Sequence, residues 1–262
     1  MREFVKKSLG QNFLIDKNII KKIISLVELK NKNIIEIGPG KGALTEEILK
    51  QKPKSLITIE KDNVLSQELQ NKYRNLKNFK NLNTDILKLD IEKLNLKNSI
   101  ILGNLPYNIS SQILVKFLRF KKWPPNFDDI IFMFQKELGE KIIGKYPSNN
   151  YGRISILTNY RLFLSSKFYV SANCFFPKPK VNSIVIHLKP KRKSSFFIKD
   201  MKNLEKVTNI LFSNKRKMIN KNIKKILNKN QIEKVNNFNL KLRPSKIKPD
   251  IYYKIAELYE IC

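Results

Sequence analysis

Short runs of β-branched residues alternate with longer amphipathic segments through the first 190 residues of the chain. The runs predict seven strands, at Asn33–Ile37, Leu56–Glu60, Asn81–Asp85, Ile100–Asn104, Ile130–Phe134, Phe168–Val170 and Ile184–Leu188. Apolar residues recur at helical spacing in residues 19–27, in Ile109–Phe117 and in Ile154–Tyr160. Strands that alternate with helices are typical of a parallel sheet wrapped by helices, so we expect a doubly wound α/β domain.

The pattern changes near Pro190. A basic, polar stretch follows, and beyond it Leu204, Val207 and Leu211 fall at helical spacing with no further β-rich runs. We therefore predict two domains: an α/β domain in residues 1–190 and a small helical domain in residues 191–262.

The chain is strongly basic. Lys and Arg number 52 against 22 Asp and Glu, a formal charge of +30, and residues 191–262 alone carry 19 basic residues against six acids. Such an excess favours a polyanionic partner, which means nucleic acid or an anionic membrane face. Part of the excess reflects composition, because 44 of the 52 basic residues are Lys and Asn is also frequent throughout. The charge thus supports a polyanion without identifying one.

Several classes of protein are disfavoured by what the sequence lacks. No stretch approaches the ~18 uninterrupted apolar residues of a membrane span, and the first 16 residues have no apolar core of a secretory signal. Cys174 and Cys262 are too few for a zinc cluster or a disulfide framework, and His187 is the only histidine. We expect a soluble, cytoplasmic protein that uses neither a metal nor a histidine base.

Three glycines at alternate positions follow the first predicted strand. Gly38, Gly40 and Gly42 lie in IIEIGPGKGALT, where a missing Cβ lets the backbone turn and approach a ligand. The dinucleotide fingerprint needs its third glycine one residue later, at the position of Ala43. With Glu36 before it, the loop suits a ligand that has a zwitterionic amino-acid end better than one that has a pyrophosphate.

Two acids close the next two predicted strands. Glu60 ends the second strand, where a carboxylate can accept both hydroxyls of a ribose. Asp85 ends the third, beside Ile86, where it can accept an adenine amine against an apolar wall. Together with the glycine loop they describe an adenosyl pocket at the carboxyl ends of the strands. The alternative is that each acid caps the helix that follows it, but their order along the chain favours the pocket.

The fourth predicted strand ends in ILGNLPYNIS. Adenine N6 is a poor nucleophile because its lone pair is delocalised into the ring, and two acceptors for its hydrogens can expose that lone pair. The side-chain oxygen of Asn104 and the carbonyl of Leu105 can supply them, since Pro106 biases Leu105 to extended geometry. Tyr107 offers a face on which the base can stack. An ordinary turn after a strand is the alternative.

These motifs, in this order, resemble those of the ribosomal RNA adenine N6,N6-dimethyltransferases, and most of all the bacterial small-subunit enzymes. The resemblance extends over nearly the whole chain, through KKSLGQNFLID, IIEIGPGKGALT, Glu60, NTDIL, ILGNLPYNIS, FMFQKE, YGRISIL, FPKPKVNSIV and LFSNKRKMI. It implies the Rossmann-like, seven-strand fold of the class I methyltransferases with a small helical C-terminal domain. It also implies S-adenosyl-L-methionine as the cofactor.

The resemblance implies roles for further residues. Asn12 and Leu14 line the cofactor pocket beside the acids and glycines above, and Phe175 helps to stack the target base. The substrate in the family is a pair of adjacent adenines in the 3′-terminal hairpin of small-subunit (16S) rRNA, each methylated twice during small-subunit biogenesis. The implied partner is the pre-small ribosomal subunit, and we expect a monomer. Asn182 departs from the aspartate that is usual in the family, and the tail near Arg243 departs as well.

Six basic residues of the tail are candidates for RNA contact: Lys215, Arg216, Lys217, Lys221, Lys224 and Lys225. The last three recur at helical spacing opposite Ile219, Ile223 and Ile226. A solvated helix face is the ordinary interpretation of such a run. The density of net positive charge in residues 191–262 is about twice that in residues 1–190, however, and this favours phosphate contact. Three other functions stay open: an enzyme for large-subunit rRNA or DNA, an assembly factor without activity, and an NAD-dependent oxidoreductase, which Ala43 disfavours.

Overall fold

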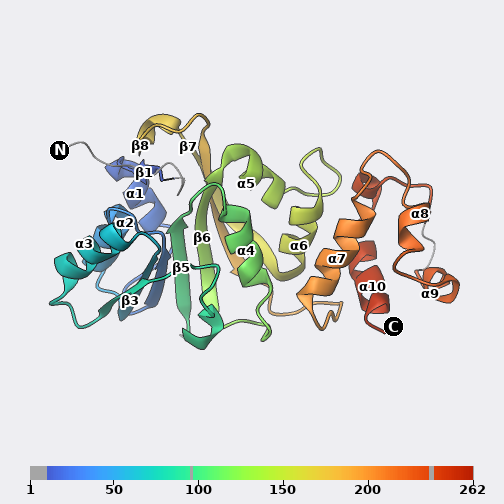
Figure 1. Cartoon of the computed structure of the whole chain (residues 1–262), viewed down its shortest axis with the longest axis horizontal. Coiled ribbons are helices and arrows are strands. Elements are labelled where there is room, and N and C mark those ends of the chain that lie inside the picture. The colour runs from blue at the N-terminus through green and yellow to red at the C-terminus, as the bar shows by residue number, and fades with distance from the viewer. Residues whose placement is uncertain (1–10, 95–96, 236–238, 262) are drawn as a thin grey trace. The chain divides into compact units, whose positions relative to one another are not determined.

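The computed structural model describes residues 11–94, 97–235 and 239–261. Its strands are β1 (Phe13–Leu14), β2 (Asn33–Ile37), β3 (Ser55–Glu60), β4 (Phe79–Asn83), β5 (Ser99–Asn104), β6 (Phe127–Gln135), β7 (Leu162–Val170), β8 (Phe175–Phe176) and β9 (Ser183–Pro190). Its helices are α1 (Lys17–Ile24), α2 (Ala43–Lys50), α3 (Asn63–Tyr73), α4 (Ser110–Leu118), α5 (Lys136–Ile142), α6 (Arg153–Arg161), α7 (Met201–Leu211), α8 (Asn220–Ile223), α9 (Lys229–Glu233) and α10 (Pro249–Tyr259). Figure 1 shows strands and helices in the blue to yellow part of the chain and helices alone in the orange to red part.

The chain divides into two compact units. The first contains the residues up to Lys116, Pro124–Gly139 and Leu164–Pro190, and the second contains Phe117–Trp123, Glu140–Phe163 and the residues from Lys191 onward. One boundary therefore falls at Pro190, where the composition changes. The second unit also takes in two segments that precede Pro190 in the sequence.

A buried arginine explains why the segment that follows α4 joins the second unit. Arg161 is 5 % exposed, and its Nη1 donates to the carbonyls of Leu118 and Phe120, both at 2.6 Å. Its guanidinium also lies over the ring of Trp123, 4.6 Å from the centroid. A buried charge has to be compensated by contacts of this kind. Arg161 therefore holds residues 118–123 against the end of α6.

Seven strands form one sheet, in the order β4-β3-β2-β5-β6-β9-β7. The strands from β4 to β6 in this order pair in parallel, with Asn104 of β5 opposite Met133 of β6. β9 is antiparallel to β6, with Ser183 opposite Gln135. The predicted seven-strand α/β fold is confirmed, but the sheet is mixed and not parallel throughout, because β9 runs antiparallel to β6. This strand is buried on both faces, so its apolar run looks like that of a parallel strand.

The predicted strands differ from those of the structure mainly at their ends. β2 has the predicted bounds, whereas β4 ends at Asn83, so that Asp85 lies two residues beyond the strand it was predicted to close. β7 is much longer than the predicted Phe168–Val170, because it begins at Leu162, directly after α6. Alternate residues of β7 are exposed, and a half-polar strand escapes a search for apolar runs.

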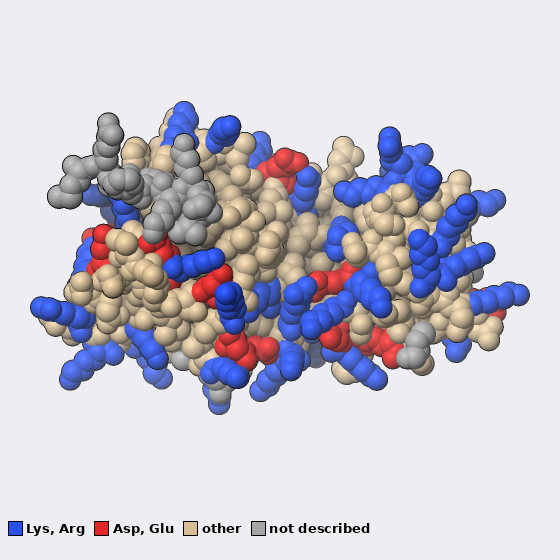
Figure 2. All heavy atoms as spheres, viewed as in Figure 1, with Lys and Arg blue, Asp and Glu red and all other residues tan. Residues whose placement is uncertain are grey.

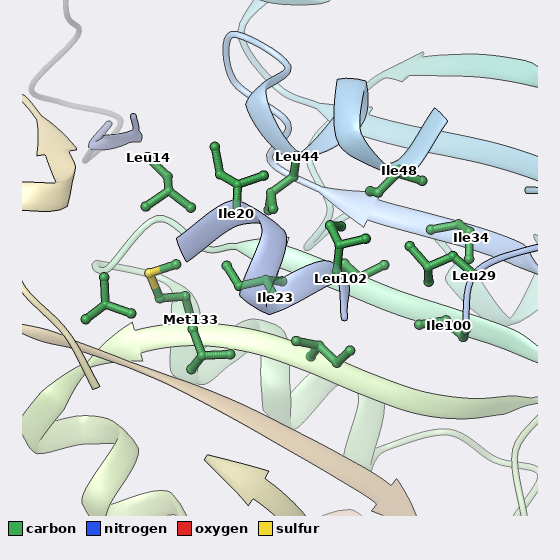
Figure 3. Packing of buried hydrophobic residues seen from close by; sticks show 14 of the residues in the cluster. Leu14, Ile20, Ile23, Leu29, Ile34, Leu44, Ile48, Ile100, Leu102 and Met133 are labelled. Carbon is green, nitrogen blue, oxygen red and sulfur yellow. The ribbon is translucent and has the colours of Figure 1, made fainter. Parts of the chain in front are cut away.

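One face of the sheet is covered by α1 and α2. Buried residues of both helices and of the strands form one hydrophobic cluster that includes Ile20, Ile23, Leu44, Ile48, Ile34, Leu102 and Met133 (Figure 3). The cluster also contains Leu14 of β1 and Phe175 of β8, which pair as a two-stranded antiparallel ribbon. Burial of each such side chain contributes ~1.5–3 kcal/mol. The ribbon is therefore anchored to the same core that supports the sheet.

Helices α6, α7 and α10 form the core of the second unit. Leu204, Val207 and Leu211, predicted at helical spacing, are all buried on α7. Tyr252 of α10 is fully buried, and its hydroxyl donates to the carbonyl of Pro244 at 2.8 Å. In the described residues of both units, no helix is long and apolar enough to cross a membrane.

Candidate active site

The glycine loop turns sharply between β2 and α2. Gly38, Gly40 and Gly42 have positive φ angles of 66°, 57° and 79°. A Cβ on Gly40 would lie 2.9 Å from the ring of Phe13, and a Cβ on Gly42 would lie 2.8 Å from Leu69, both closer than real Cβ atoms approach. The loop can follow this path only with glycine at these two positions.

Glu60 lies at the end of β3 beside the glycine loop. Its Oε2 accepts from the backbone N of Gly40 at 3.1 Å, and its Oε1 accepts from the backbone N of Asp62 at 2.8 Å. The residue is 8 % exposed, and burial raises the pKa of its carboxyl although both amides oppose the shift. Carboxylate oxygens keep further lone pairs for hydroxyl donors. The fold thus holds a bidentate acceptor in one orientation.

Glu36 is buried at the base of the loop, with 1 % exposure. The hydroxyl of Thr45 donates to its Oε2 at 2.7 Å. Burial raises the pKa of Glu36 to about 8, which outweighs the hydrogen bond from Thr45, and the nearby charge of Glu60 adds to the rise. The carboxyl therefore holds its proton at neutral pH. A cationic group beside it would stabilise the ionised form instead.

Asp85 reaches the same region from the loop after β4. The Nζ of Lys61 lies 2.9 Å from its Oδ2, and the backbone N of Leu87 donates to its Oδ1 at 2.9 Å. Burial by itself would raise the pKa of Asp85, but the lysine and the amide outweigh it, so the pKa lies below its usual range. Asp85 is therefore an ionised acceptor at neutral pH.

The segment before α1 is held against these loops. Phe13 of β1 lies opposite Phe176 of β8. Gln11 Nε2 donates to Asp62 Oδ2 at 3.3 Å, and the carbonyl of Asn12 accepts from Asn104 Nδ2 at 2.9 Å. Strands of two residues show no alternation in a sequence, so this ribbon was not predicted.

The turn after β5 contains the residues predicted for catalysis. Because Asn104 Nδ2 donates to the carbonyl of Asn12, the amide has one orientation, in which Oδ1 remains an acceptor. The hydroxyl of Tyr107 lies 2.6 Å from Ser183 Oγ, which holds the half-buried ring at one end. The side chain of Leu105 is buried with 2 % exposure. The turn therefore presents an oriented amide oxygen and an oriented ring.

A cavity of about 440 Å³ brings these groups together in the first unit. Twelve of the fourteen residues predicted for catalysis, cofactor binding or base stacking line it: Asn12, Leu14, Glu36, Gly38, Gly40, Glu60, Asp85, Ile86, Asn104, Leu105, Pro106 and Tyr107. They come from five separate stretches of the chain. The order of the motifs predicts that these residues form one site, and they line one cavity.

The structure places the other two residues elsewhere. Gly42 caps the amino end of α2 and packs against Leu69. Phe175, expected to stack the target base, is 3 % exposed and belongs to the hydrophobic cluster. Successive side chains of a strand point to opposite sides. Phe176 is therefore the outward ring of β8, with 50 % exposure.

Phe13, Lys41 and Lys61 also line the cavity, and none of the three was predicted as a site residue. The Nζ of Lys41 lies 5.3 Å from the centroid of the Phe13 ring, and Lys61 pairs with Asp85. Lys41 lies between two of the glycines, and Lys61 follows Glu60 directly. Both lysines could have been predicted to line the site, because each is adjacent in the sequence to a predicted site residue.

The six basic residues predicted for RNA contact are exposed in the second unit, in and before α8 and just after it. Ile219, Ile223 and Ile226 are buried, as their helical spacing predicts. Figure 2 shows many Lys and Arg side chains around α8 and α9 and few acids. Exposure of this kind fits both phosphate contact and a solvated face, so RNA contact stays a prediction.

Two residues noted in the sequence have structural contacts. Asn182 Oδ1 accepts from the backbone N of Ala172 at 3.0 Å, a role that an aspartate oxygen could also perform. His187 is 3 % exposed, with its Nε2 2.6 Å from Asp129 Oδ1 toward the amino end of β6. Among the described residues, no group of three or more His, Cys, Asp and Glu side chains could hold a metal ion.

Comparison with known proteins decides the family. The family model described as ribosomal RNA adenine dimethylase matches residues 2–260. The chain belongs to this family. The resemblance drawn from the motifs of this rRNA adenine dimethylase is thereby confirmed.

Curated relatives in the rRNA adenine dimethylase family match the chain over almost its full length. It is 41 % identical over 256 residues to the ribosomal RNA small subunit methyltransferase A of Pelagibacter ubique, and the match covers 97 % of each chain. It is 38 % identical over 267 residues to the protein of the same name from Malacoplasma penetrans, which covers 98 % of this chain and 93 % of that one.

Solved structures share the fold of this rRNA adenine dimethylase. A dimethyladenosine transferase from Plasmodium falciparum superposes with a TM-score of 0.75 at 24 % identity, over 93 % of this chain and 95 % of the other. The 23S rRNA methyltransferase ErmE superposes with a TM-score of 0.69 at 22 % identity, over 95 % and 100 %. At such identities the likeness is one of fold.

Proposed function

We propose that this rRNA adenine dimethylase transfers methyl groups from S-adenosyl-L-methionine to N6 of two adjacent adenines in the 3′-terminal hairpin of small-subunit rRNA, twice on each. The observation that carries the proposal is the cavity in which Glu60 and Asp85 lie together with the oriented amide of Asn104. The names of the curated relatives support the small subunit as the source of the RNA.

The residues of the cavity fit this cofactor. A volume of about 440 Å³ is within the range of small-molecule sites. Ionised Asp85 would accept the adenine amine, and Glu60 would accept the ribose hydroxyls. The ammonium of the amino-acid end would favour the ionised form of Glu36. When bound, the cofactor supplies an electrophilic methyl group on a sulfonium.

Asn104 and Leu105 would prepare the target nitrogen for attack. The amide oxygen of Asn104 and the carbonyl of Leu105 would accept the two N6 hydrogens and turn the lone pair toward the methyl group. The link from Asn104 to Asn12 sets the amide in advance, so little reorganisation is needed during transfer. Each methylation would leave N6 with one proton to release, which water can take up. In the second transfer only one N6 hydrogen remains, and one acceptor suffices. Positioning and electrostatics carry the step without a histidine.

Tyr107 would stack on the target adenine. An adenine in a hairpin loop can leave its stack, and a base on an aromatic ring gains ~1–3 kcal/mol. The bond between the Tyr107 hydroxyl and Ser183 holds the ring before the base arrives. The exposed basic residues around α8 would contact phosphates of the same RNA. We expect a monomer that works on assembling small subunits in the cytoplasm.

The test is transfer from labelled S-adenosylmethionine to undermethylated small ribosomal subunits, followed by mass spectrometry of the rRNA. We expect dimethyladenine at two adjacent positions of the 3′-terminal hairpin. Large-subunit rRNA serves as the second substrate in the same assay. Dimethyladenine in large-subunit rRNA alone, or monomethyladenine as the final product, would contradict the proposal.

A substitution of Glu60 tests the cofactor half of the proposal. Glu60→Ala removes an acceptor that two backbone amides hold in place. Charged hydrogen bonds contribute ~1.5–3 kcal/mol each, so we expect calorimetry to show cofactor affinity at least about tenfold lower. Glu28→Ala, at an exposed position outside the cavity, should bind as the wild type does. Unchanged affinity in Glu60→Ala would remove the ribose assignment.

A further inference from the structure

Lys61 and Asp85 follow two neighbouring strands at the same edge of the sheet. In the parallel pair of β3 and β4, Glu60 lies opposite Asn83, and the backbone N of Thr84 donates to the carbonyl of Glu60 at 3.0 Å. The next residue of each segment therefore emerges beside the other at the carboxyl end of the strands. Both side chains line the cavity, and the Nζ of Lys61 lies 2.9 Å from Oδ2 of Asp85.

The two oxygens of Asp85 are each held by one contact. β4 ends at Asn83, so Asp85 lies in the loop beyond the strand. The backbone N of Leu87 donates to Oδ1 at 2.9 Å, and the ammonium of Lys61 pairs with Oδ2. Burial would raise the pKa of the carboxyl, and the contact with Lys61 is the strongest of those that lower it. The plane of the ionised carboxylate is thus set, while its oxygens keep lone pairs for a further donor.

The burial of the two partners differs. The side chain of Lys61 is 57 % exposed, and an ion pair with so exposed a partner contributes little to the free energy of unfolding. The side chain of Asp85 is only 16 % exposed and lines the cavity. The direction of its carboxylate therefore affects a ligand in the cavity, even where the pair contributes little to stability.

We propose that Lys61 is a positioning residue, which orients the carboxylate of Asp85 toward the exocyclic amine of the cofactor's adenine. The inference rests on the proposed function, because it needs a cofactor whose adenine lies at Asp85. Lys61 acts on the ligand through Asp85: its ammonium donates to Oδ2, and the adenine amine donates to a remaining lone pair of the same carboxylate. This arrangement favours adenine over a purine that lacks the amine.

The test compares two ligands, with binding measured by calorimetry in the absence of RNA. One ligand is S-adenosylhomocysteine, and the other is its analogue in which purine replaces adenine, so that only the amine is missing. Both carry the same net charge, so the loss of a lysine charge acts on both alike and cancels in the ratio of their affinities. In the wild type S-adenosylhomocysteine should bind about ten- to a hundredfold more tightly, the contribution of one hydrogen bond to a charged group.

Lys61→Met removes the ammonium and keeps an unbranched apolar side chain. We expect the ratio of the two affinities to fall by about three- to fivefold, near the upper limit for a partly exposed ion pair. The affinity for the purine analogue should stay unchanged, which a general disturbance of the cavity would not allow.

Lys88→Met is the matched control. Lys88 is exposed in the same loop as Asp85, and its charge also lowers the pKa of Asp85, but it is not among the described residues that line the cavity. The ratio in this variant should equal that of the wild type. An equal fall of the ratio in Lys88→Met and Lys61→Met would trace the effect to charge alone and overturn the inference.

Two further outcomes would overturn the inference: a wild-type ratio in Lys61→Met, and an equal loss of affinity for both ligands, which a merely structural role would produce. Failure of the proposed function gives different results. If the wild type binds both ligands equally, the adenine assignment of Asp85 fails and the inference fails with it. If the wild type binds S-adenosylhomocysteine more tightly but transfers no methyl group to rRNA, the proposed function fails and the ratio still decides the inference.

Discussion

At the scale of single residues, the cavity depends on groups that their surroundings hold in one state. The carbonyl of Asn12 orients the amide of Asn104, and burial keeps the carboxyl of Glu36 protonated at neutral pH. The residue type determines which hydrogen bonds a side chain can accept or donate. The direction of an amide and the pKa of a buried acid are set by atoms from distant parts of the chain.

The amide of Asn104 gives a prediction about rate. Asn104→Ala should slow methyl transfer at saturating cofactor by about 10²–10³-fold, the usual effect of the loss of one preorganised polar group. Asn104→Asp should be slow as well, because a carboxylate oxygen would face the carbonyl of Asn12. Single-turnover assays with labelled cofactor measure both. Asn149→Ala, in an exposed loop, should keep the wild-type rate, and a wild-type rate in Asn104→Ala would exclude the proposed role.

The raised pKa of Glu36 gives a prediction about stability and pH. Its ordinary pKa is 4.5 and its folded pKa is about 8. Between these values the folded state holds a proton that the unfolded state has lost, so stability falls as pH rises, by up to about 1.4 kcal/mol per pH unit. Glu36→Gln should lose this dependence.

Denaturant unfolding at pH 5 and pH 8 measures the effect. The free energy of unfolding of Glu36→Gln relative to the wild type should increase from pH 5 to pH 8. Glu28→Gln, at an exposed position, provides the comparison and should show no such increase. Equal pH dependence in Glu36→Gln and the wild type would refute the raised pKa.

At the scale of elements, loops and short strands position the site while the sheet supports them. The glycine loop, the β1–β8 ribbon and the turn after β5 meet through contacts of Gly40 with Phe13 and of Asn12 with Asn104. Each contact joins segments that are far apart in the sequence. A substitution that moves one of these segments should therefore also shift the other two.

Gly40 tests this coupling. Gly40→Ala puts a side chain at a φ of 57° and a Cβ 2.9 Å from the Phe13 ring. We expect a loss of about 1–2 kcal/mol of stability from the backbone alone, and a loss of cofactor affinity because Gly40 N also contacts Glu60. Gly152→Ala is the control, since nothing lies within 4 Å of its added Cβ and its φ is −177°. Wild-type stability and affinity in Gly40→Ala would contradict the tight approach.

At the scale of the whole molecule, charge supports the choice of an RNA partner without selecting the base. The formal charge of +30 is spread over both units. The residues that line the cavity are instead neutral or acidic for the most part. The proposed function therefore assigns affinity for a polyanion and selection of one adenine to different parts of the surface.

The tail lysines give the prediction at this scale. Replacement of Lys221, Lys224 and Lys225 by Gln should lower the salt slope of RNA binding by about 2–3, since each lost phosphate contact contributes about 0.7–0.9. The rate at saturating RNA should stay unchanged. Replacement of Lys77, Lys80 and Lys97, all exposed in the first unit, removes the same charge and serves as the control. An unchanged salt slope in the tail variant would show that these lysines do not contact phosphates and only form a solvated helix face.

By itself, the sequence predicted the approximate positions of the seven strands, several of the helices between them and twelve of the residues that line the cavity. Apolar periodicity follows from local geometry, and parallel strands bring their carboxyl ends to one edge, so an ordered set of motifs predicts one site. The tertiary structure alone decided the antiparallel direction of β9, the ribbon that turns Phe175 into the core, and the loop position of Asp85. These features depend on contacts between residues far apart in the chain, which leave no periodic trace in either partner.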